Sequence, residues 1–330
     1  MLKFRTTIDI PSPDFQINYQ YPILSVGSCF ADEIGQKLQD MHYQVVLNPF
    51  GVLYNPISIR NSVALLLNDY TFVEEDLFYH NGLWHSFQHH SSFSRTDKET
   101  CLLHINTALA NARKALEDTK VLVLTFGTSW VYELEETGKV VSNCHKLSAN
   151  NFYRRRLSVD EILDSFGGLL EYLKIRLPDL QIIMTVSPVR HLKDGFAGNQ
   201  ISKATLLLAV QELCEQLDYV HYFPSYEIMM DDLRDYRFYK EDLVHPNKTA
   251  INYIWEQFSQ HVLNDEEGGL RKRIAQLHRA LSHKPFNPAS EGHQKFVQKQ
   301  LNNIEELGRE APYLDFSKAQ THFKAQLLEL

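Results

Sequence analysis

The sequence of 330 residues predicts an α/β fold with a parallel sheet of about five strands, followed by a helical appendage. Short, continuous apolar runs alternate along the chain with segments whose apolar residues recur at helical spacing. The run at 121–126, VLVLTF, is almost wholly apolar, as in an interior strand that is covered on both faces of a parallel sheet. Strands and helices that alternate at these lengths indicate βαβ units.

Each element follows from its local pattern. Buried apolar runs predict strands at 22–27, 43–47, 121–126, 181–186 and 219–223. Helical spacing predicts helices at 30–41, 56–67, 99–116, 159–177, 202–217 and 248–263, the second of them with Pro56 in its first turn. Residues 70–97 are aromatic and rich in histidine without a clear period, which predicts loops and short strands. Residues 131–141 predict a hairpin that turns at Thr137-Gly138.

Two parts of the chain differ in character. Residues 1–263 hold the alternation of strands and helices, and we expect them to form one domain. Residues 264–330 open with a linker-like break, DEEGG, and continue as charged amphipathic helices that are interrupted by Pro285, Pro288 and Pro312. We expect this appendage to pack on the core or on a partner, and self-association through its helices is one way to do so.

Composition and charge argue against several functional classes. The chain has 41 acidic and 33 basic side chains, and its net charge of −8 repels phosphate backbones, so nucleic acid is not expected as a partner. The basic run at 154–156 is expected in a solvated loop or at a helix start. No stretch approaches the roughly 18 apolar residues of a membrane span, and residues 1–10 lack the apolar segment of a signal peptide. The four cysteines form no CxxC pair, so we expect free thiols and a cytoplasmic protein.

The polar residues that follow the strands are the candidate site residues, because open parallel sheets bind ligands beyond the carboxyl ends of their strands. Ser28 comes directly after the first predicted strand, at the start of a helix. There the helix dipole and the backbone N–H groups favour negative charge that develops near its hydroxyl. Serine is also a favoured N-cap residue, which is the purely structural alternative.

Asp242 and His245 lie three residues apart, just before the last predicted helix of the core. Across a turn, this spacing lets the carboxylate reach Nδ1 of the imidazole, which fixes the tautomer and leaves Nε2 free to accept a proton. Pro246 suits the first position of the following helix, which would place His245 at its N-terminus and favour the neutral imidazole. A surface aspartate beside a capping histidine is the structural alternative.

Six short motifs, which occur in order over roughly 20–262, carry a resemblance to one family. They are 27–31 (GSCFA), 48–51 (NPFG), 127–130 (GTSW), 143–145 (NCH), 187–189 (SPV) and 242–246 (DLVHP). The chain resembles the GSCFA family, which is named for the first motif, and through it the SGNH or GDSL hydrolase group. The resemblance implies a flavodoxin-like three-layer α/β/α sandwich and an enzyme that hydrolyses or transfers acyl groups without a metal or other cofactor.

By this resemblance Ser28 corresponds to the nucleophile, Gly51 to an oxyanion glycine, and Asp242 and His245 to the base pair. The chain departs from the SGNH pattern after Gly127, where Thr128 and Ser129 follow and the oxyanion asparagine is missing. Loss of one oxyanion donor typically costs about 2.7 to 4 kcal/mol of barrier. Asn55, Thr128 and Ser129 are candidates to replace it.

Other side chains on the predicted active face have two interpretations each. His145, Arg190 and His191 follow predicted strands or hairpins and either contact substrate or support loops; the guanidinium of Arg190 suits an anion. Cys29 adjoins Ser28 and is the alternative nucleophile, although a buried structural cysteine is commoner. The aromatic residues Trp84, Phe87 and Trp130 are candidates for an apolar or sugar-stacking wall.

A cluster of five histidines raises the question of a metal, because two of them have the i,i+4 spacing that binds zinc on a helix. The five are His80, His85, His89, His90 and His104. This segment does not have a helical pattern and no matching carboxylate or cysteine set is nearby, so we expect no metal, and we expect His90 at the mouth of the pocket.

The sequence therefore predicts an acyl-ester hydrolase or O-acyltransferase that acts on a small ester or an acylated carbohydrate. In the expected reaction Ser28 attacks, His245 takes its proton and Asp242 orients His245. The alternative is a binding protein on the same scaffold that recognises a glycan or another small ligand without turnover. The missing asparagine favours this alternative, and the intact Ser, Asp and His set argues against it.

Overall fold

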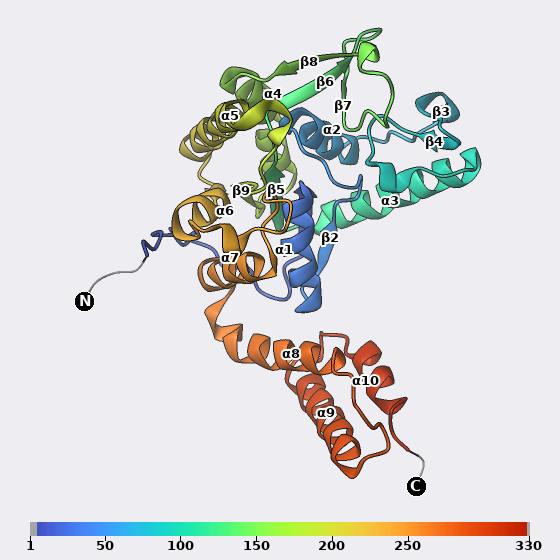
Figure 1. Ribbon diagram of the computed structural model, residues 1–330, viewed down its shortest axis with the longest axis vertical. Helices are drawn as coiled ribbons and strands as arrows, with labels where there is room; N and C mark the ends of the chain where they lie inside the picture. Colours follow the sequence, from blue (N-terminus) through green and yellow to red (C-terminus); the bar gives the residue numbers. More distant parts are fainter. Residues whose placement is uncertain (1–4, 329–330) are drawn as a thin grey trace.

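The computed structural model describes residues 5–328 (Figure 1). Residues 1–4 of the predicted first domain and residues 329–330 of the predicted appendage lie outside the described residues. The central strands are β1 (Ile23–Gly27), β2 (Val45–Leu47), β5 (Val121–Phe126), β9 (Gln181–Val186) and β10 (Val220–Tyr222). The helices around them are α1 (Cys29–Asp40), α2 (Pro56–Leu66), α3 (Lys98–Asp118), α4 (Val159–Arg176), α5 (Gly195–Gln216), α6 (Ser225–Glu227) and α7 (Lys248–His261). Among residues 5–328 no helix has both the length and the apolar composition to cross a membrane.

The five central strands run parallel, in the order β10-β9-β5-β1-β2. The chain moves from β1 to the edge strand β2 and then returns to the other side of β1 through β5. The connections therefore diverge on the two sides of β1, and ligands bind in such sheets at the carboxyl ends of the strands where this happens. Gly27 at the end of β1 pairs with Thr125 of β5, which brings the 27–31 and 127–130 motifs together.

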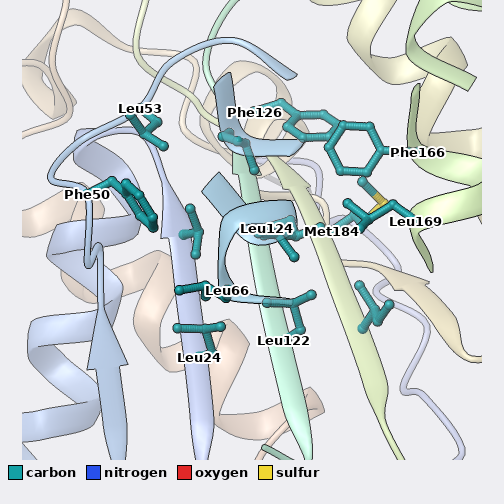
Figure 2. Packing of buried hydrophobic residues seen from close by; sticks show 14 of the residues in the cluster. Leu24, Phe50, Leu53, Leu66, Leu122, Leu124, Phe126, Phe166, Leu169 and Met184 are labelled. Atoms are coloured by element: carbon teal, nitrogen blue, oxygen red, sulfur yellow. The ribbon is translucent and has the colours of Figure 1, made fainter. Parts of the chain in front are cut away.

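Both faces of the sheet are buried, because alternate residues of each strand point to opposite sides. On one face Leu24, Leu122 and Met184 pack with residues of α2 to α5, among them Leu66 and Phe166 (Figure 2). On the other face the intervening residues pack with α1 and α7. The result is a flavodoxin-like three-layer α/β/α sandwich, which confirms the predicted fold class.

Two small antiparallel units lie beside the central sheet. The first is the hairpin of β3 (Phe78–His80) and β4 (Leu83–His85), in the segment expected to hold short strands. The second is a sheet in the order β7-β6-β8, formed by β6 (Trp130–Leu134), β7 (Val140–Val141) and β8 (Phe152–Arg156). Strands β6 and β7 form the predicted hairpin.

Strand β8 corrects the expectation for the basic run at 154–156, which was a solvated loop or a helix start. The run is paired along β6, and two of its arginines have carboxylate partners. Arg154 donates from Nη2 to Oδ2 of Asp194 at 2.7 Å, and Arg155 donates from Nε to Oε1 of Glu133 at 2.8 Å. Arg155 also donates to Glu161, so carboxylates offset the charge of two of the three consecutive arginines in this strand.

Three helices follow the core: α8 (Gly268–Leu281), α9 (Glu291–Glu310) and α10 (Ser317–Lys324). The prolines at 285, 288 and 312 lie between them, as expected. Leu270 and Ile274 of α8 belong to the same buried cluster as Ile10 and Tyr19 of the N-terminal segment. The helices extend away from the sheet (Figure 1), so α8 connects the appendage to the core.

Candidate active site

The passage from β1 to α1 depends on Gly27. A Cβ at this position would lie 2.4 Å from the carbonyl oxygen of Thr125, and Gly27 has a φ of 158°. Its N–H donates to Oδ1 of Asn48 at 2.8 Å, and the amide of Asn48 donates to Oδ1 of Asp32 at 2.5 Å. Glycine thus allows the strand ends to approach, and these hydrogen bonds join the first two sequence motifs.

Ser28 is the N-cap residue of α1, but its side chain makes no capping hydrogen bond. The residue is 1% exposed, and its hydroxyl has no hydrogen-bond partner within residues 5–328. A Cβ built on Gly127 would lie 3.4 Å from Cβ of Ser28. The serine side chain is therefore packed between the ends of β1 and β5.

A pocket of about 450 Å³ opens beside this junction. Its lining comes from loops after β1, β5 and β9, from the small sheet and from the segment before α7. The lining residues are Cys29, Tyr54, Asn55, Thr128, Trp130, Tyr132, Val141, Ser142, Asn143, Cys144, Arg154, Val189, Arg190, His191, Lys193, Asp194 and His245. Cys29 lines this pocket together with His245, whereas Ser28 is not among the lining residues.

Asp242 and His245 form the hydrogen-bonded pair that their spacing predicts. Nδ1 of His245 lies 2.7 Å from Oδ2 of Asp242, and both side chains are about half exposed. Oδ1 of Asp242 also accepts from the N–H groups of Val244 and His245, at 2.9 Å each. These backbone hydrogen bonds, followed by the contact with the imidazole, lower the pKa of Asp242 to about 2. The carboxylate therefore stays ionised and directs Nε2 of His245 away from itself.

The expected position of His245 at a helix N-terminus is wrong. Helix α7 begins at Lys248, and Asn247 is its N-cap, with its side chain accepting from the N–H groups of Thr249 and Ala250. His245 thus precedes the cap, because Asn247 supplies a stronger start signal than Pro246. Asp242, rather than the helix, fixes the orientation of the imidazole.

The two N–H groups expected to form the oxyanion hole are hydrogen bonded elsewhere. The N–H of Ser28 donates to the carbonyl of Thr125 at 3.2 Å, and that of Gly51 donates to the carbonyl of Asn48 at 2.7 Å. Gly51 has a φ of 74° in this turn and does not line the pocket. Both groups close the backbone turns in which they lie, and this corrects the expected donor role.

The backbone N–H groups of the third motif, residues 127–130, also have hydrogen-bond partners within the protein. The N–H groups of Gly127 and Thr128 donate to the carbonyl of Tyr54 at 2.8 and 3.0 Å, and that of Ser129 donates to Oγ of Ser202 at 2.8 Å. Ser129 is fully buried, while the Thr128 hydroxyl lies 3.0 Å from Ser202 Oγ. Thr128 lines the pocket and Ser129 does not. Within this motif, Thr128 and Trp130 are therefore the residues that line the pocket.

Asn55 lines the pocket, but its side chain caps α2. Its Oδ1 accepts from the N–H of Ser58 at 2.8 Å, and its Nδ2 lies 3.0 Å from the Ser58 hydroxyl. The start of α1 is different, because the Ser28 side chain leaves its first turn uncapped. The first N–H groups of a helix have no partner inside the helix. Those of Cys29 and Phe30 have no side-chain cap, and both lie close enough to the Cys29 thiol to lower its pKa.

Arg190 and His191 line the pocket as predicted. The guanidinium of Arg190 has Met230 as a neighbour, with Nη2 3.0 Å from the sulfur. Burial lowers the pKa of His191 to about 4, and its Nε2 has no partner within residues 5–328. His191 is therefore a neutral group beside the cationic Arg190.

His145 does not reach the pocket, in contrast to the prediction. Its Nε2 lies 2.9 Å from the carbonyl of Ser86, and burial lowers its pKa to about 4. Its ring packs against those of Phe78 and His85. The loop that carries it turns back through a positive φ of 48°, which directs the side chain toward the hairpin of β3 and β4. Cys144 occupies the pocket instead.

The aromatic segment also packs away from the pocket. Trp84, Phe87 and His90 are absent from the lining, and Phe87 stacks on Phe78 at 4.1 Å between ring centroids. Of the three aromatic residues predicted to form a wall, Trp130 alone lines the pocket. Three histidines of this segment bond to serine hydroxyls: His85 to Ser94 at 2.7 Å, His89 to Ser86 at 3.0 Å and His90 to Ser92 at 3.1 Å. Within residues 5–328 no group of three or more histidine, cysteine or carboxylate side chains could hold a metal ion.

Three features of the pocket were not found from the sequence. Tyr132 and Lys193 line it, and Arg154 lies over the ring of Trp130 at 4.3 Å while it pairs with Asp194. The pairing of β8 with β6 places Arg154 opposite Tyr132, and no local motif signals this contact.

Beneath the strand ends, Lys203 of α5 is 1% exposed. Its Nζ donates to the carbonyls of Gly127 and Ser187 at 2.6 and 2.7 Å. Burial lowers the pKa of Lys203 to about 7. A lysine in the middle of a helical pattern gives no sign that it joins the ends of two strands.

The fold and this pocket define a class: a flavodoxin-like α/β protein with an Asp-His pair at the carboxyl edge of its sheet. The chain belongs to the GSCFA family, whose profile matches residues 22–258. A second profile, that of the GSCFA domain protein C-terminal domain, matches residues 274–329. No curated protein matches the chain.

Two solved structures are similar to this chain at low identity. One is of a proposed platelet activating factor from Streptococcus pneumonia, with 14% identity, a TM-score of 0.37 and coverage of 74% of this chain and 85% of that one. The other is the acetyl xylan esterase Est2A from the rumen bacterium Butyrivibrio proteoclasticus, with 10% identity, a TM-score of 0.35 and coverage of 77% and 65%. At these TM-scores neither similarity carries an argument about this chain.

Proposed function

We propose that this GSCFA protein is an acyl-ester hydrolase or an O-acyltransferase, with His245 and Asp242 as its base pair. The observation that carries the proposal is the 2.7 Å contact between Nδ1 of His245 and Asp242, with His245 lining a pocket at the start of α1. A carboxylate that fixes Nδ1 leaves Nε2 as a proton acceptor. The Ser28 hydroxyl and the Cys29 thiol lie at this junction as the candidate nucleophiles.

The proposed reaction has two steps. The nucleophile attacks the acyl carbon while His245 accepts its proton, and the ester C–O bond breaks as His245 returns the proton to the leaving alcohol. Water or a second hydroxyl then attacks the acyl-enzyme, again with His245 as base, and the nucleophile is regenerated. Asp242 stays ionised throughout and stabilises the imidazolium.

The pocket suits a small ester or an acylated carbohydrate. Its volume of about 450 Å³ lies in the range of small-molecule sites. Trp130 and Tyr132 provide aromatic surface on which a sugar ring can stack. The cationic side chains Arg154, Arg190 and Lys193 outnumber Asp194 in the lining, which favours a substrate that also bears negative charge.

The second candidate function is binding without turnover. The observation that favours it is that the N–H groups of Ser28, Gly51 and Gly127 all have intramolecular carbonyl partners. A site that lacked oxyanion donors would bind an ester but would stabilise the transition state poorly. The uncapped N–H groups at the start of α1 argue for catalysis instead.

Hydrolysis of p-nitrophenyl acetate distinguishes the two functions. We expect wild type to turn over the ester and His245→Ala to lose about 10²- to 10⁴-fold in kcat/KM, because the general base is removed. His322→Ala, an exposed histidine on α10, is the matched control and should retain the activity. Equal rates for wild type and His245→Ala would contradict the enzymatic function and favour the binding protein.

A further inference from the structure

We propose that the thiol of Cys29, rather than the hydroxyl of Ser28, is the nucleophile of this site. The inference rests on the proposed acyl-transfer function and concerns which atom attacks. Three independent observations carry it: the lining of the pocket, the position of each residue relative to α1, and the groups that surround the thiol.

The first observation is access to the base. Cys29, His245 and Thr128 line one pocket, and Cys29 is partly exposed to it. Ser28 is 1% exposed, has no place in that lining and packs beside Gly127. Adjacent side chains at a strand-to-helix junction point in different directions. Of the two, Cys29 shares the pocket lining with His245 and Ser28 does not.

The second observation is position along α1. Cys29 is the first residue of the helix, whereas Ser28 is the N-cap and still belongs to the turn. The N–H of Ser28 is held by the carbonyl of Thr125, and its carbonyl accepts from the N–H of Ala31 at 2.8 Å. Since Ser28 does not cap the helix with its side chain, the N–H groups of Cys29 and Phe30 have no side-chain cap, lie at the positive end of the helix dipole and are close to the Cys29 thiol. These two groups replace the oxyanion donors expected at Ser28 and Gly51.

The third observation is the set of charged groups around the thiol. Burial and the carboxylate of Asp32 raise the pKa of the Cys29 thiol, while Lys203 and the N–H groups of Phe30 and Cys29 oppose that change. The net direction is upward, so the resting group is a neutral thiol that needs a base. His245, held by Asp242, is the base that lines the same pocket.

The reaction balances without any other reagent. The Cys29 S–H proton passes to Nε2 of His245 as the sulfur attacks the acyl carbon, and the oxyanion forms beside the first N–H groups of α1. The C–O bond to the alcohol breaks, the alcohol takes the proton from His245, and a thioester remains on Cys29. Water or a hydroxyl acceptor, deprotonated by His245, attacks this thioester, and the departing thiolate recovers the proton.

The test is to locate the acyl group after a brief reaction with p-nitrophenyl acetate, by intact-mass and peptide mass spectrometry. Four proteins are compared: wild type, Cys29→Ala, Ser28→Ala and His245→Ala, each checked for folding by circular dichroism and thermal melting. We expect one acetyl group on Cys29 in wild type and Ser28→Ala, released by neutral hydroxylamine as a thioester is. We expect at least about a 1,000-fold loss of turnover in Cys29→Ala. Cys29→Ser, the closest variant in shape, replaces Cys29→Ala if that variant proves poorly folded. It should retain part of the activity.

The outcomes separate the failure of this inference from the failure of the proposed function. Acetyl on Ser28 that survives in Cys29→Ala and disappears in Ser28→Ala would overturn the cysteine nucleophile and leave the acyl-transfer function intact. Acetyl on Cys29 that forms equally fast in His245→Ala would show a merely accessible thiol and would overturn the inference. No acetyl group on either residue, with turnover unchanged in His245→Ala, would overturn both.

Discussion

The two walls of the pocket differ in how their side chains are held. The junction wall consists of Cys29, Thr128 and His245. The hydrogen bond from the imidazole of His245 to a side chain goes to Asp242, and Nε2 of the ring has no hydrogen-bond partner within residues 5–328. The hydroxyl of Thr128 is engaged by Ser202 and by the N–H of Trp130, so the imidazole of His245 and the thiol of Cys29 are the groups of this wall suited to exchange protons and form bonds.

The arginine–aromatic wall consists of Trp130, Tyr132, Arg154, Lys193 and Asp194. The side chains of this wall contact one another. Arg154 pairs with Asp194 and lies over both aromatic rings, 4.3 Å from that of Trp130 and 5.2 Å from that of Tyr132. Lys193 lies 4.9 Å from the Tyr132 ring and donates to its hydroxyl.

This difference separates the expected roles. The junction wall comes from segments that carry recognisable motifs, and it holds the base and the candidate nucleophile of the proposed acyl transfer. The arginine–aromatic wall is preorganised, as substrate-binding surfaces are when they must orient a ligand at low entropic cost. Variants of the first should change kcat, and variants of the second should change KM and substrate preference.

The largest effect is expected for Asp242→Asn. The amide oxygen can still accept from the N–H groups of Val244 and His245, but the NH₂ group cannot accept from Nδ1 of His245, so the imidazole is no longer held in its donor tautomer. We expect kcat on p-nitrophenyl acetate to fall about 10²- to 10⁴-fold with little change in KM. Asp235→Asn is the matched control, since Asp235 also accepts from a backbone N–H in a neighbouring turn but lies outside the pocket. A change confined to KM would mean that Asp242 does not orient the base.

Arg154→Met tests the opposite wall. The change removes a guanidinium and leaves the Asp194 carboxylate without its partner, so a negatively charged substrate should bind more weakly. We expect KM for p-nitrophenyl hemisuccinate to rise about 10- to 100-fold, while kcat on p-nitrophenyl acetate changes less than about 3-fold. Arg155→Met, on the same strand but outside the lining, is the control. Equal losses on both esters would show that the two walls do not divide their roles.

Lys203→Met tests the buried lysine that joins the ends of β5 and β9. Because the pKa of Lys203 in the folded protein is about 7 and the ordinary value is 10.5, the folded state loses this proton before the unfolded state does. Stability should therefore rise as the pH increases from 7 to 9, by about 1 to 2 kcal/mol. Urea unfolding of wild type should show this rise and Lys203→Met should not. Lys174→Met, which removes a lysine that donates to one carbonyl, is the control and should behave as wild type.

The smallest effect is expected for Lys193→Met. Lys193 is on the more exposed side of the arginine–aromatic wall, where charge pairs contribute little. We expect the preference for the hemisuccinate ester over the acetate to fall about 3- to 10-fold at low salt and less at high salt. Lys139→Met, in the nearby hairpin but outside the lining, should leave the preference unchanged. A preference that does not respond to Lys193 or to salt would exclude charge as its origin.

The sequence predicts the fold well, because the strands carry continuous apolar runs. Strands β5 and β9 lie at 121–126 and 181–186 as predicted, and the segment from 70 to 97 holds the expected short strands. The prediction from the sequence is wrong at 154–156, where three arginines give no local sign of a strand. Asp194, which pairs with Arg154, and Glu133, which pairs with Arg155, are distant in the sequence, so tertiary contacts decide this element.

The candidate site likewise has one part that the local sequence predicts and another that depends on tertiary contacts. The contact between Asp242 and His245 follows from their spacing, because both lie in one turn. The direction of the Ser28 and Cys29 side chains does not follow from their order, since it depends on where β1 ends and α1 begins. Likewise the engagement of the Gly51 and Gly127 N–H groups depends on loops that meet only in the folded chain. The nucleophile and the oxyanion donors are therefore the parts of the site that a motif leaves open.

The most direct test of the account is the pH dependence of Cys29 alkylation by iodoacetamide, read by peptide mass spectrometry in wild type and His245→Ala. Because the pKa of this thiol is raised, it should react at neutral pH only when His245 can take its proton. We predict rapid alkylation of wild type near pH 7, at least about 10-fold slower alkylation of His245→Ala, and recovery of the variant as the pH rises above 9. The buried Cys101 serves as an internal control that should react slowly in both proteins. Equal rates for Cys29 in the two proteins across this pH range would contradict the pairing of His245 with a nucleophile at the start of α1.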